Sequence, residues 1–162
     1  MTEHFIDLTD GTRLDIKVNF GTLYYLQRQK GYYRIMKKVK KNPKSLTEHE
    51  SFEMTANIIY ALLRSNGKTV SFDEALSLIP PDTKDIARVL DAFREEFDKY
   101  DKKKTSEDYE DIIEIDWVSY MLAAKEMCIS EEEFWNTDPI FFNKLYEKYQ
   151  ENKIKEMKLN GR

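Results

Sequence analysis

Few side chains in this sequence are of the kinds that perform acid–base, nucleophilic or metal chemistry. The two histidines are His4, near the N-terminus, and His49, in a polar helix start, and both positions predict exposed side chains. Cys128 is the single cysteine, and its apolar neighbours predict a small buried hydrophobe. No Cys/His spacing suits zinc and no glycine-rich phosphate loop is present. We therefore expect no catalytic residue, no metal and no cofactor, and a protein that is not an enzyme.

A run of carboxylates between Glu107 and Asp116 is the other group that could bind a metal ion. This run contains no basic residue. It lacks the fixed spacing of oxygen ligands and the central glycine of a calcium loop. Runs of like charge are usually solvated, so we interpret it as part of a charged linker.

A basic stretch occupies residues 28–44, within a region from Ile16 to Thr47 that has no acidic residue. Its cationic residues are Arg28, Lys30, Arg34, Lys37, Lys38, Lys40, Lys41 and Lys44. Four tyrosines at positions 24, 25, 32 and 33 accompany them, and aromatic rings with cations are the chemistry that binds single-stranded nucleic acid. The chain as a whole is acidic, however, with a pI of about 5.4 and a net charge of -4. We therefore prefer a basic face that meets an acidic protein surface, such as the chain's own acidic run, and keep a nucleic-acid-binding regulator or adaptor as the alternative function.

The C-terminal region combines two helix starts with many aromatic residues. Ser130 and Glu133 fit a capping box, and Asp138 followed by Pro139 fits a second N-cap. A unit of about 45 residues cannot bury so many rings by itself, given how surface scales with size. We predict that some bind a partner, although helical spacing also allows them to form a small core. The predicted partner-binding residues are Phe134, Trp135, Pro139, Phe141, Phe142 and Tyr146.

A β-hairpin is predicted at residues 5–20. In its second strand, apolar residues alternate with polar ones at Leu14, Ile16, Val18 and Phe20. Asp10-Gly11 predicts a type I′ turn between the strands. Because a lone hairpin is marginal in water, it must lie on helices or add to a partner's sheet.

Helix signals follow along the rest of the chain. Thr47 with Glu50, and Ser71 with Glu74, both fit the capping box. The clearest amphipathic helix follows, with apolar residues at helical spacing: Ile86, Val89, Leu90, Phe93, Phe97 and Tyr100.

These signals together predict a mainly α fold, with an N-terminal β-hairpin followed by a small helical bundle and a C-terminal helical appendage. We expect a body at residues 1–100, a charged linker at 101–115 and a small helical module at 116–162, with fraying from Lys153 onward. The 162 residues contain no apolar run of about 18 residues and no signal peptide, so we expect no membrane partner and a cytoplasmic protein.

The C-terminal pattern resembles that of the tail assembly chaperones of long-tailed bacteriophages and prophages of Gram-positive hosts. The resemblance lies in the Ser-Glu-Glu-Glu-Phe-Trp start at 130–135, the Thr-Asp-Pro cap at 137–139 and the aromatic helix at 141–149. It implies a non-enzymatic factor in the bacterial host cell. The N-terminal body would bind the tape measure protein, and the module around Trp135 would recruit the major tail (tube) protein. Self-association is a further expectation, since charge blocks of opposite sign can meet between copies.

Overall fold

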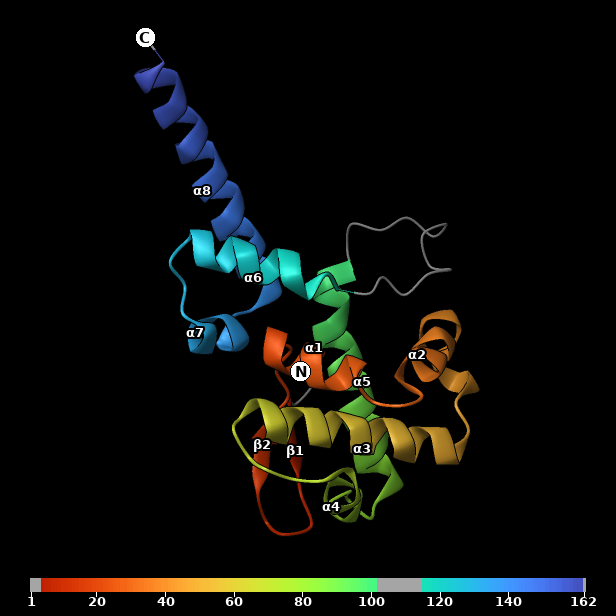
Figure 1. Cartoon of the computed structure of the whole chain (residues 1–162). Coiled ribbons are helices and arrows are strands. Elements are labelled where there is room, and N and C mark those ends of the chain that lie inside the picture. The colour runs from red at the N-terminus through yellow and green to blue at the C-terminus, as the bar shows by residue number, and fades with distance from the viewer. Residues whose placement is uncertain (1–3, 102–114, 162) are drawn as a thin grey trace. The chain divides into compact units, whose positions relative to one another are not determined.

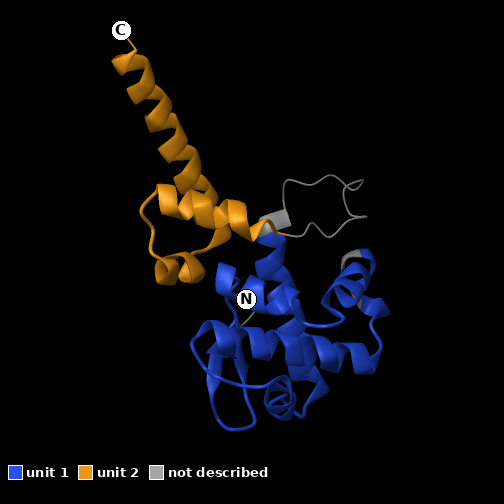
Figure 2. Ribbon diagram, viewed as in Figure 1, with its two compact units in different colours: residues 1–113 blue, residues 114–162 orange. Residues whose placement is uncertain are grey.

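The computed structural model describes residues 4–101 and 115–161 (Figure 1). In these residues the fold is mainly α, with eight α-helices, one short 3-10 helix and one two-stranded N-terminal sheet. This confirms the predicted fold class. The chain divides into two compact units, residues 1–113 and residues 114–162 (Figure 2). The predicted linker, apart from its two end residues, lies outside the described residues.

The N-terminal hairpin pairs β1 (Phe5–Asp7) with β2 (Arg13–Asp15) in antiparallel register, with Ile6 opposite Leu14. The apolar alternation is confirmed: Leu14, Ile16, Val18 and Phe20 are all buried.

The predicted type I′ turn is wrong. That turn needs positive φ at both central residues, and among Thr9, Asp10 and Gly11 only the glycine has it, at 85°. The amide of Gly11 instead donates to the carbonyl of Leu8, and the amide of Leu8 donates to Thr12. The connection is therefore a three-residue loop that ends on a left-handed glycine.

The hairpin lies on helices of its own unit. The Nη1 atom of Arg88, in α5 (Thr83–Asp101), donates to the carbonyl oxygen of Phe5 at 2.9 Å. The Arg88 guanidinium also stands over the Phe5 ring, 5.1 Å from its centroid. On the loop side, Thr9 donates to the carbonyls of Ser77 and Leu78. These contacts show that the hairpin packs against helices, which is one of the two expected arrangements.

Helix α3 (Glu48–Ser65) is the centre of the first unit. It contacts α1 (Phe20–Gln27), α2 (Tyr32–Lys41), α4 (Phe72–Ser77) and α5. Every residue of α3 from 54 to 59 is buried, so this helix is covered around most of its circumference. The short helix η1 (Pro43–Ser45) leads into it, and the predicted Thr47–Glu50 capping box is confirmed.

The second unit contains α6 (Trp117–Glu126), α7 (Glu131–Asn136) and α8 (Pro139–Asn160). The capping box of Ser130 and Glu133 is confirmed, as is the Asp138 cap, whose Oδ1 accepts from the amide of Phe141 at 2.9 Å. The fraying predicted from Lys153 is wrong. No glycine or second proline interrupts α8 before Gly161, and its last turns are rich in residues of high helix propensity.

Cys128 is exposed, so the prediction of a buried thiol is also wrong. Its backbone ends α6 with φ of 57°, in the left-handed region. The amide of Cys128 donates to Lys125 and the amide of Ile129 donates to Ala124, which is the Schellman pattern. The helix end therefore determines the position of this residue, and it directs the thiol to solvent.

Candidate protein-binding surfaces

Chemistry-bearing groups do not gather in the described part of the chain. Within residues 4–101 and 115–161, no group of three or more His, Cys, Asp or Glu side chains could hold a metal ion. No helix in those ranges is long and apolar enough to cross a bilayer. His49 is exposed on α3, as predicted, but His4 is half-buried, with its Nδ1 3.0 Å from Oε1 of Glu96. The surfaces that can bind other macromolecules therefore become the candidates for a functional site.

An aromatic cluster holds the three helices of the second unit together. Phe142 on α8 lies 5.6 Å from the ring of Tyr120 on α6 and 5.7 Å from that of Phe134 on α7. Phe134 and Phe142 are 0% and 1% exposed, and Pro139 is buried beside them in sequence. Three of the six predicted partner-binding residues are therefore core residues in this fold. These three residues follow the alternative expectation from the sequence, which was that aromatic residues at helical spacing form a small core.

The other three predicted residues remain accessible. Phe141 is 60% exposed, although it adjoins the buried Phe142. Trp135 is half-buried, and its ring lies 5.6 Å from that of Trp117. Tyr146 is also half-buried, and its hydroxyl accepts from the Gln150 amide at 2.7 Å. A partner can reach these three rings without opening the core.

Exposed apolar side chains concentrate in the second unit. Of the eight large hydrophobic side chains that are exposed in the described residues, seven belong to residues 114–162, and only Leu76 belongs to the first unit. They are Val118, Leu122, Phe141, Leu145, Ile154, Met157 and Leu159. Single exposed apolar residues are ordinary, but this concentration in under a third of the chain is typical of an interaction surface. Sequence reasoning missed six of the seven because it considered only the aromatic residues.

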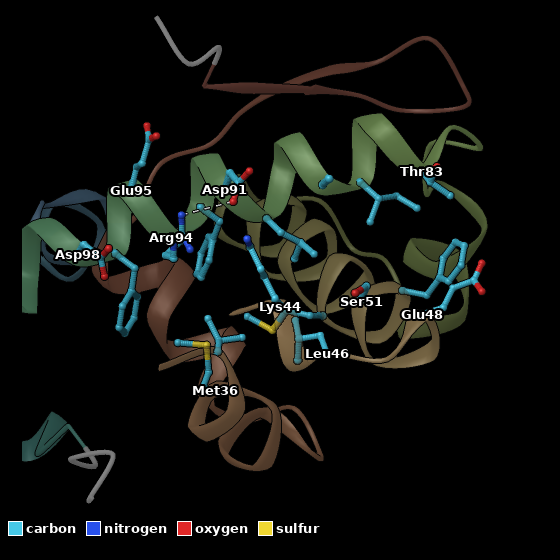
Figure 3. Close-up of a pocket in the computed structure, with 18 residues that line it drawn as sticks. Met36, Lys44, Leu46, Glu48, Ser51, Thr83, Asp91, Arg94, Glu95 and Asp98 are labelled. Carbon is cyan, nitrogen blue, oxygen red and sulfur yellow. Dashed lines mark ion pairs between the residues drawn. The ribbon is translucent and has the colours of Figure 1, made fainter. Parts of the chain in front are cut away.

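The first unit has an apolar groove of about 900 Å³ between α2 and α5, with α3 beneath (Figure 3). In Figure 3 the lining residues of α5 run from Thr83 to Asp98 along one side, and Met36 and Leu46 lie opposite them. The apolar lining consists of Met36, Val39, Leu46, Phe52, Met54, Ile86, Ala87, Leu90, Phe93 and Phe97. Sequence reasoning identified four of these residues, Ile86, Leu90, Phe93 and Phe97, as one face of an amphipathic helix, but it could not show that this face borders an open groove.

The rim of the groove carries more acidic than basic residues. Its carboxylates are Glu48, Asp91, Glu95 and Asp98, and its cations are Lys44 and Arg94. Arg94 pairs with Asp91 across 3.5 Å, the ion pair drawn in Figure 3. A ligand with an apolar face and flanking positive charges would complement both the lining and the rim.

Two cations of the predicted basic patch are paired with carboxylates of α3. Lys38 and Arg34 donate to Oε1 of Glu50 at 2.5 Å and 3.1 Å, and Arg34 also reaches Glu53 at 3.4 Å. Glu50 is only 5% exposed. The pKa of Glu50 is lowered to about 2, mainly by the hydrogen bond from Lys38 and next by the hydrogen bond from the amide of Thr47. The basic face thus meets an acidic surface of its own chain, as expected, but that surface is α3. Residues 107–114 of the acidic run lie outside the described residues.

The rest of the patch is spread over several elements. Lys30, Lys37, Lys41 and Lys44 are exposed, and the side chain of Lys40 lies outside the described set. Arg28 stands over the Tyr24 ring at 4.9 Å, at a polar cleft of about 360 Å³ formed by α1 and α3. The other residues of this cleft are Tyr25, Gln29, Tyr60 and Arg64. Tyr32 is buried and cannot stack on a base, so the structure gathers only part of the predicted aromatic and basic set.

No family model matches this chain, and no curated protein or solved structure does either. The surfaces described above are therefore the guide to function.

Proposed function

We propose that this protein is a non-enzymatic, protein-binding assembly factor with two binding surfaces. The observation that carries the proposal is that each compact unit has an apolar surface of its own, a groove in the first and a set of exposed side chains in the second. Together with the C-terminal motifs, this favours a tail assembly chaperone that acts in the cytoplasm of a bacterial host. It would bind the tape measure protein and recruit tail tube subunits during tail morphogenesis.

The groove of the first unit suits a helical partner such as a tape measure protein. Its lining from Thr83 to Asp98 follows about four turns of α5, or roughly 22 Å. An amphipathic helix that lies in such a groove buries its apolar face, and its polar face remains in water. A long helical protein needs such a contact to keep its apolar surface out of water until its final partners cover that surface.

The second unit suits recruitment of a folded subunit. On α6, Val118 and Leu122 are four residues apart and are 70% and 60% exposed. On α8, Phe141 and Leu145 have the same spacing and are 60% and 38% exposed. Residues four apart share one face of a helix, so each pair forms a small apolar patch. Small apolar patches beside charged residues are typical of the interfaces of transient complexes, in which the two proteins bind and later separate.

Capture of tube protein tests the second surface. Purified full-length chain, the Leu122→Ser/Phe141→Ser double variant and a Leu76→Ser control would each be mixed with the tail tube protein encoded by a neighbouring gene. Wild type and control should capture the tube protein, and the double variant should capture at least about tenfold less, since apolar anchors carry most interface energy. Equal capture by the double variant would refute the assignment of this surface.

Capture of the tape measure protein tests the groove. Ala87 lies in the groove and is exposed, so Ala87→Glu adds a charge to the apolar lining without disturbing the core. Lys84→Glu, on an exposed position of α5 that does not line the groove, is the matched control. The groove variant should lose the tape measure protein and the control should retain it. If wild type captures neither neighbouring protein, the chaperone proposal is wrong.

The alternative function is a nucleic-acid-binding regulator or adaptor. The observation that favours it is the cleft where Arg28 stands over Tyr24 and Arg64 stands over Tyr25. Rings with adjacent guanidinium groups can stack on unpaired bases. Fluorescence anisotropy with a labelled single-stranded oligonucleotide would support this function if binding weakens steeply with salt and Arg28→Ala reduces it.

A further inference from the structure

The C-terminal half of α8 is exposed along its whole length in the described structure, and its ion pair with another helix joins Lys153 Nζ to Oε1 of Glu126 on α6 at 3.8 Å. Every residue from 151 to 160 is exposed, and three of them are large and apolar: Ile154, Met157 and Leu159. Before this segment, Tyr149 stacks with Tyr146, and Lys153 reaches the Tyr149 ring at 5.7 Å. We call residues 151–160 the arm. A helix of ten residues is marginal in water by itself, so the arm is stabilised mainly by continuity with the rest of α8.

The groove of the first unit matches the arm in length and in polarity. The arm spans about 15 Å as a helix, and the groove follows roughly 22 Å of α5. Ile154 and Met157 are three residues apart and so lie on one face, which can point into an apolar lining. Within the lining, Leu90 and Phe97 are half-buried and can contact an inserted side chain.

The charges of the two surfaces are also complementary. The rim carries four carboxylates and two cations, which gives it a net charge of -2. The arm carries three lysines and two glutamates, which gives it a net charge of +1. Its lysines are Lys153, Lys155 and Lys158. An apolar stripe with flanking lysines is therefore complementary to an apolar groove with an acidic rim, and such charges favour encounter and correct register.

We propose that the arm of one copy of this protein binds the groove of a second copy. The interface is heterologous, because the arm and the groove are different surfaces, so association continues to a closed ring or an open chain of subunits. The inference depends on the proposed function in one respect, since it uses the groove assigned there to the tape measure protein. Self-association then keeps the apolar groove out of water until a partner helix displaces the arm.

The oligomeric state of the full-length chain is the first test. By light scattering after size exclusion, the wild-type mass should rise above the 19.3 kDa of one chain as concentration increases. Met157→Glu should weaken association at least about tenfold, the effect of losing one anchor residue. Lys125→Glu, an exposed charge change on α6, should leave association unchanged. A monomer at every concentration, or association that persists in Met157→Glu, would overturn the proposal.

Disulfide trapping identifies the contact and shows whether it joins two copies. In a Cys128→Ser background, chains carrying Met157→Cys would be mixed with chains carrying Ala87→Cys. A disulfide-linked pair should form from the mixture under mild oxidation, and Lys125→Cys in place of Met157→Cys should give at least about tenfold less. Failure to trap the mixed pair would overturn the proposal.

A charge-reversal series provides a second check on the same contact. Lys155→Glu/Lys158→Glu in the arm, or Glu95→Lys/Asp98→Lys in the rim, should each weaken association, and the two sets combined should restore it. Absence of rescue would contradict the assigned pairing. None of these measurements includes a phage protein, so self-association can fail or succeed independently of the chaperone function.

Discussion

Replacement of Phe142 by alanine should unfold the second unit and leave the first unit folded. Phe142 is 1% exposed, and its ring contacts both Tyr120 on α6 and Phe134 on α7. Removing it deletes the aromatic contacts of α8 with the other two helices and opens a cavity where they meet.

The expected loss is as large as the stability of the unit. A buried Phe→Ala substitution lowers the free energy of unfolding by about 3–5 kcal/mol. A unit of about 50 residues is stable by roughly 2.5–7 kcal/mol, at ~0.05–0.15 kcal/mol per residue. For a unit of this size, the urea dependence is about 1 kcal/mol per molar. The urea midpoint should therefore fall by about 3–5 M, which places it near or below zero over the lower half of this stability range.

The assay uses the position of the tryptophans. The chain has two, Trp117 and Trp135, and both belong to the second unit, where their rings lie 5.6 Å apart. Tryptophan emission therefore reports unfolding of this unit alone, and far-UV circular dichroism reports both units. In Phe142→Ala, emission should shift to the red without urea, while a second circular dichroism transition remains for the first unit.

Phe141→Ala is the matched control, since it removes the same side chain one residue earlier. Phe141 is 60% exposed, so its loss should change stability by no more than about 0.5 kcal/mol. If Phe142→Ala keeps the wild-type emission maximum and urea midpoint, the ring cluster is not the core of this unit. Equal effects of the two variants would also refute the assignment of one ring to the core and its neighbour to the surface.

Three further predictions concern single side chains. Because the folded pKa of Glu50 is about 2 against an ordinary value of 4.5, its contribution to stability is present above pH 4.5 and is lost as pH falls toward 2. The thermal midpoint of Glu50→Gln should therefore lie below that of wild type at pH 7, and the difference should disappear as the pH falls from 4.5 to 2. A difference that does not change with pH would contradict the pairing of Glu50 with Lys38. Ser130→Ala removes a capping-box oxygen and should lower the stability of the second unit by about 1 kcal/mol, measured by tryptophan emission in urea. Cys128→Gly places glycine at a left-handed backbone position and should raise the stability of the second unit by about 1 kcal/mol. In the wild-type protein the exposed Cys128 thiol should react at once with a thiol reagent, and a slow reaction would mean that the thiol is buried.

The elements of this fold were predictable where local chemistry determines them. The capping boxes at Thr47, Ser71 and Ser130 place three helix starts, and each depends only on residues three positions apart. The alternation from Leu14 to Phe20 likewise identified the buried face of the hairpin. The hairpin turn was missed because Asp10-Gly11 fits more than one loop length, and hydrogen bonds from Leu8 and Gly11 favour the longer loop.

The binding surfaces were less predictable because they depend on contacts between distant residues. Phe141 and Phe142 are identical neighbours, and only the direction of the α6 packing against α8 decides that Phe142 is buried. The neutralisation of Arg34 by Glu50 joins residues 16 positions apart on different helices. The groove similarly requires residues of α2, α3 and α5 to line one cavity, which no local pattern in the sequence indicates.

The docking of the hairpin on α5 has a consequence for synthesis of the protein. The hydrogen bond from Arg88 to Phe5 joins residues separated by 83 positions. At a translation rate of about 5–20 residues per second, the ribosome needs roughly 4–17 s to produce the second partner after the first. During that interval β1 has no α5 to pack against, so the nascent chain exposes an apolar strand pair to chaperones or to neighbouring chains. The second unit has no such delay, because its partners are close in sequence, and it can fold soon after it leaves the ribosome.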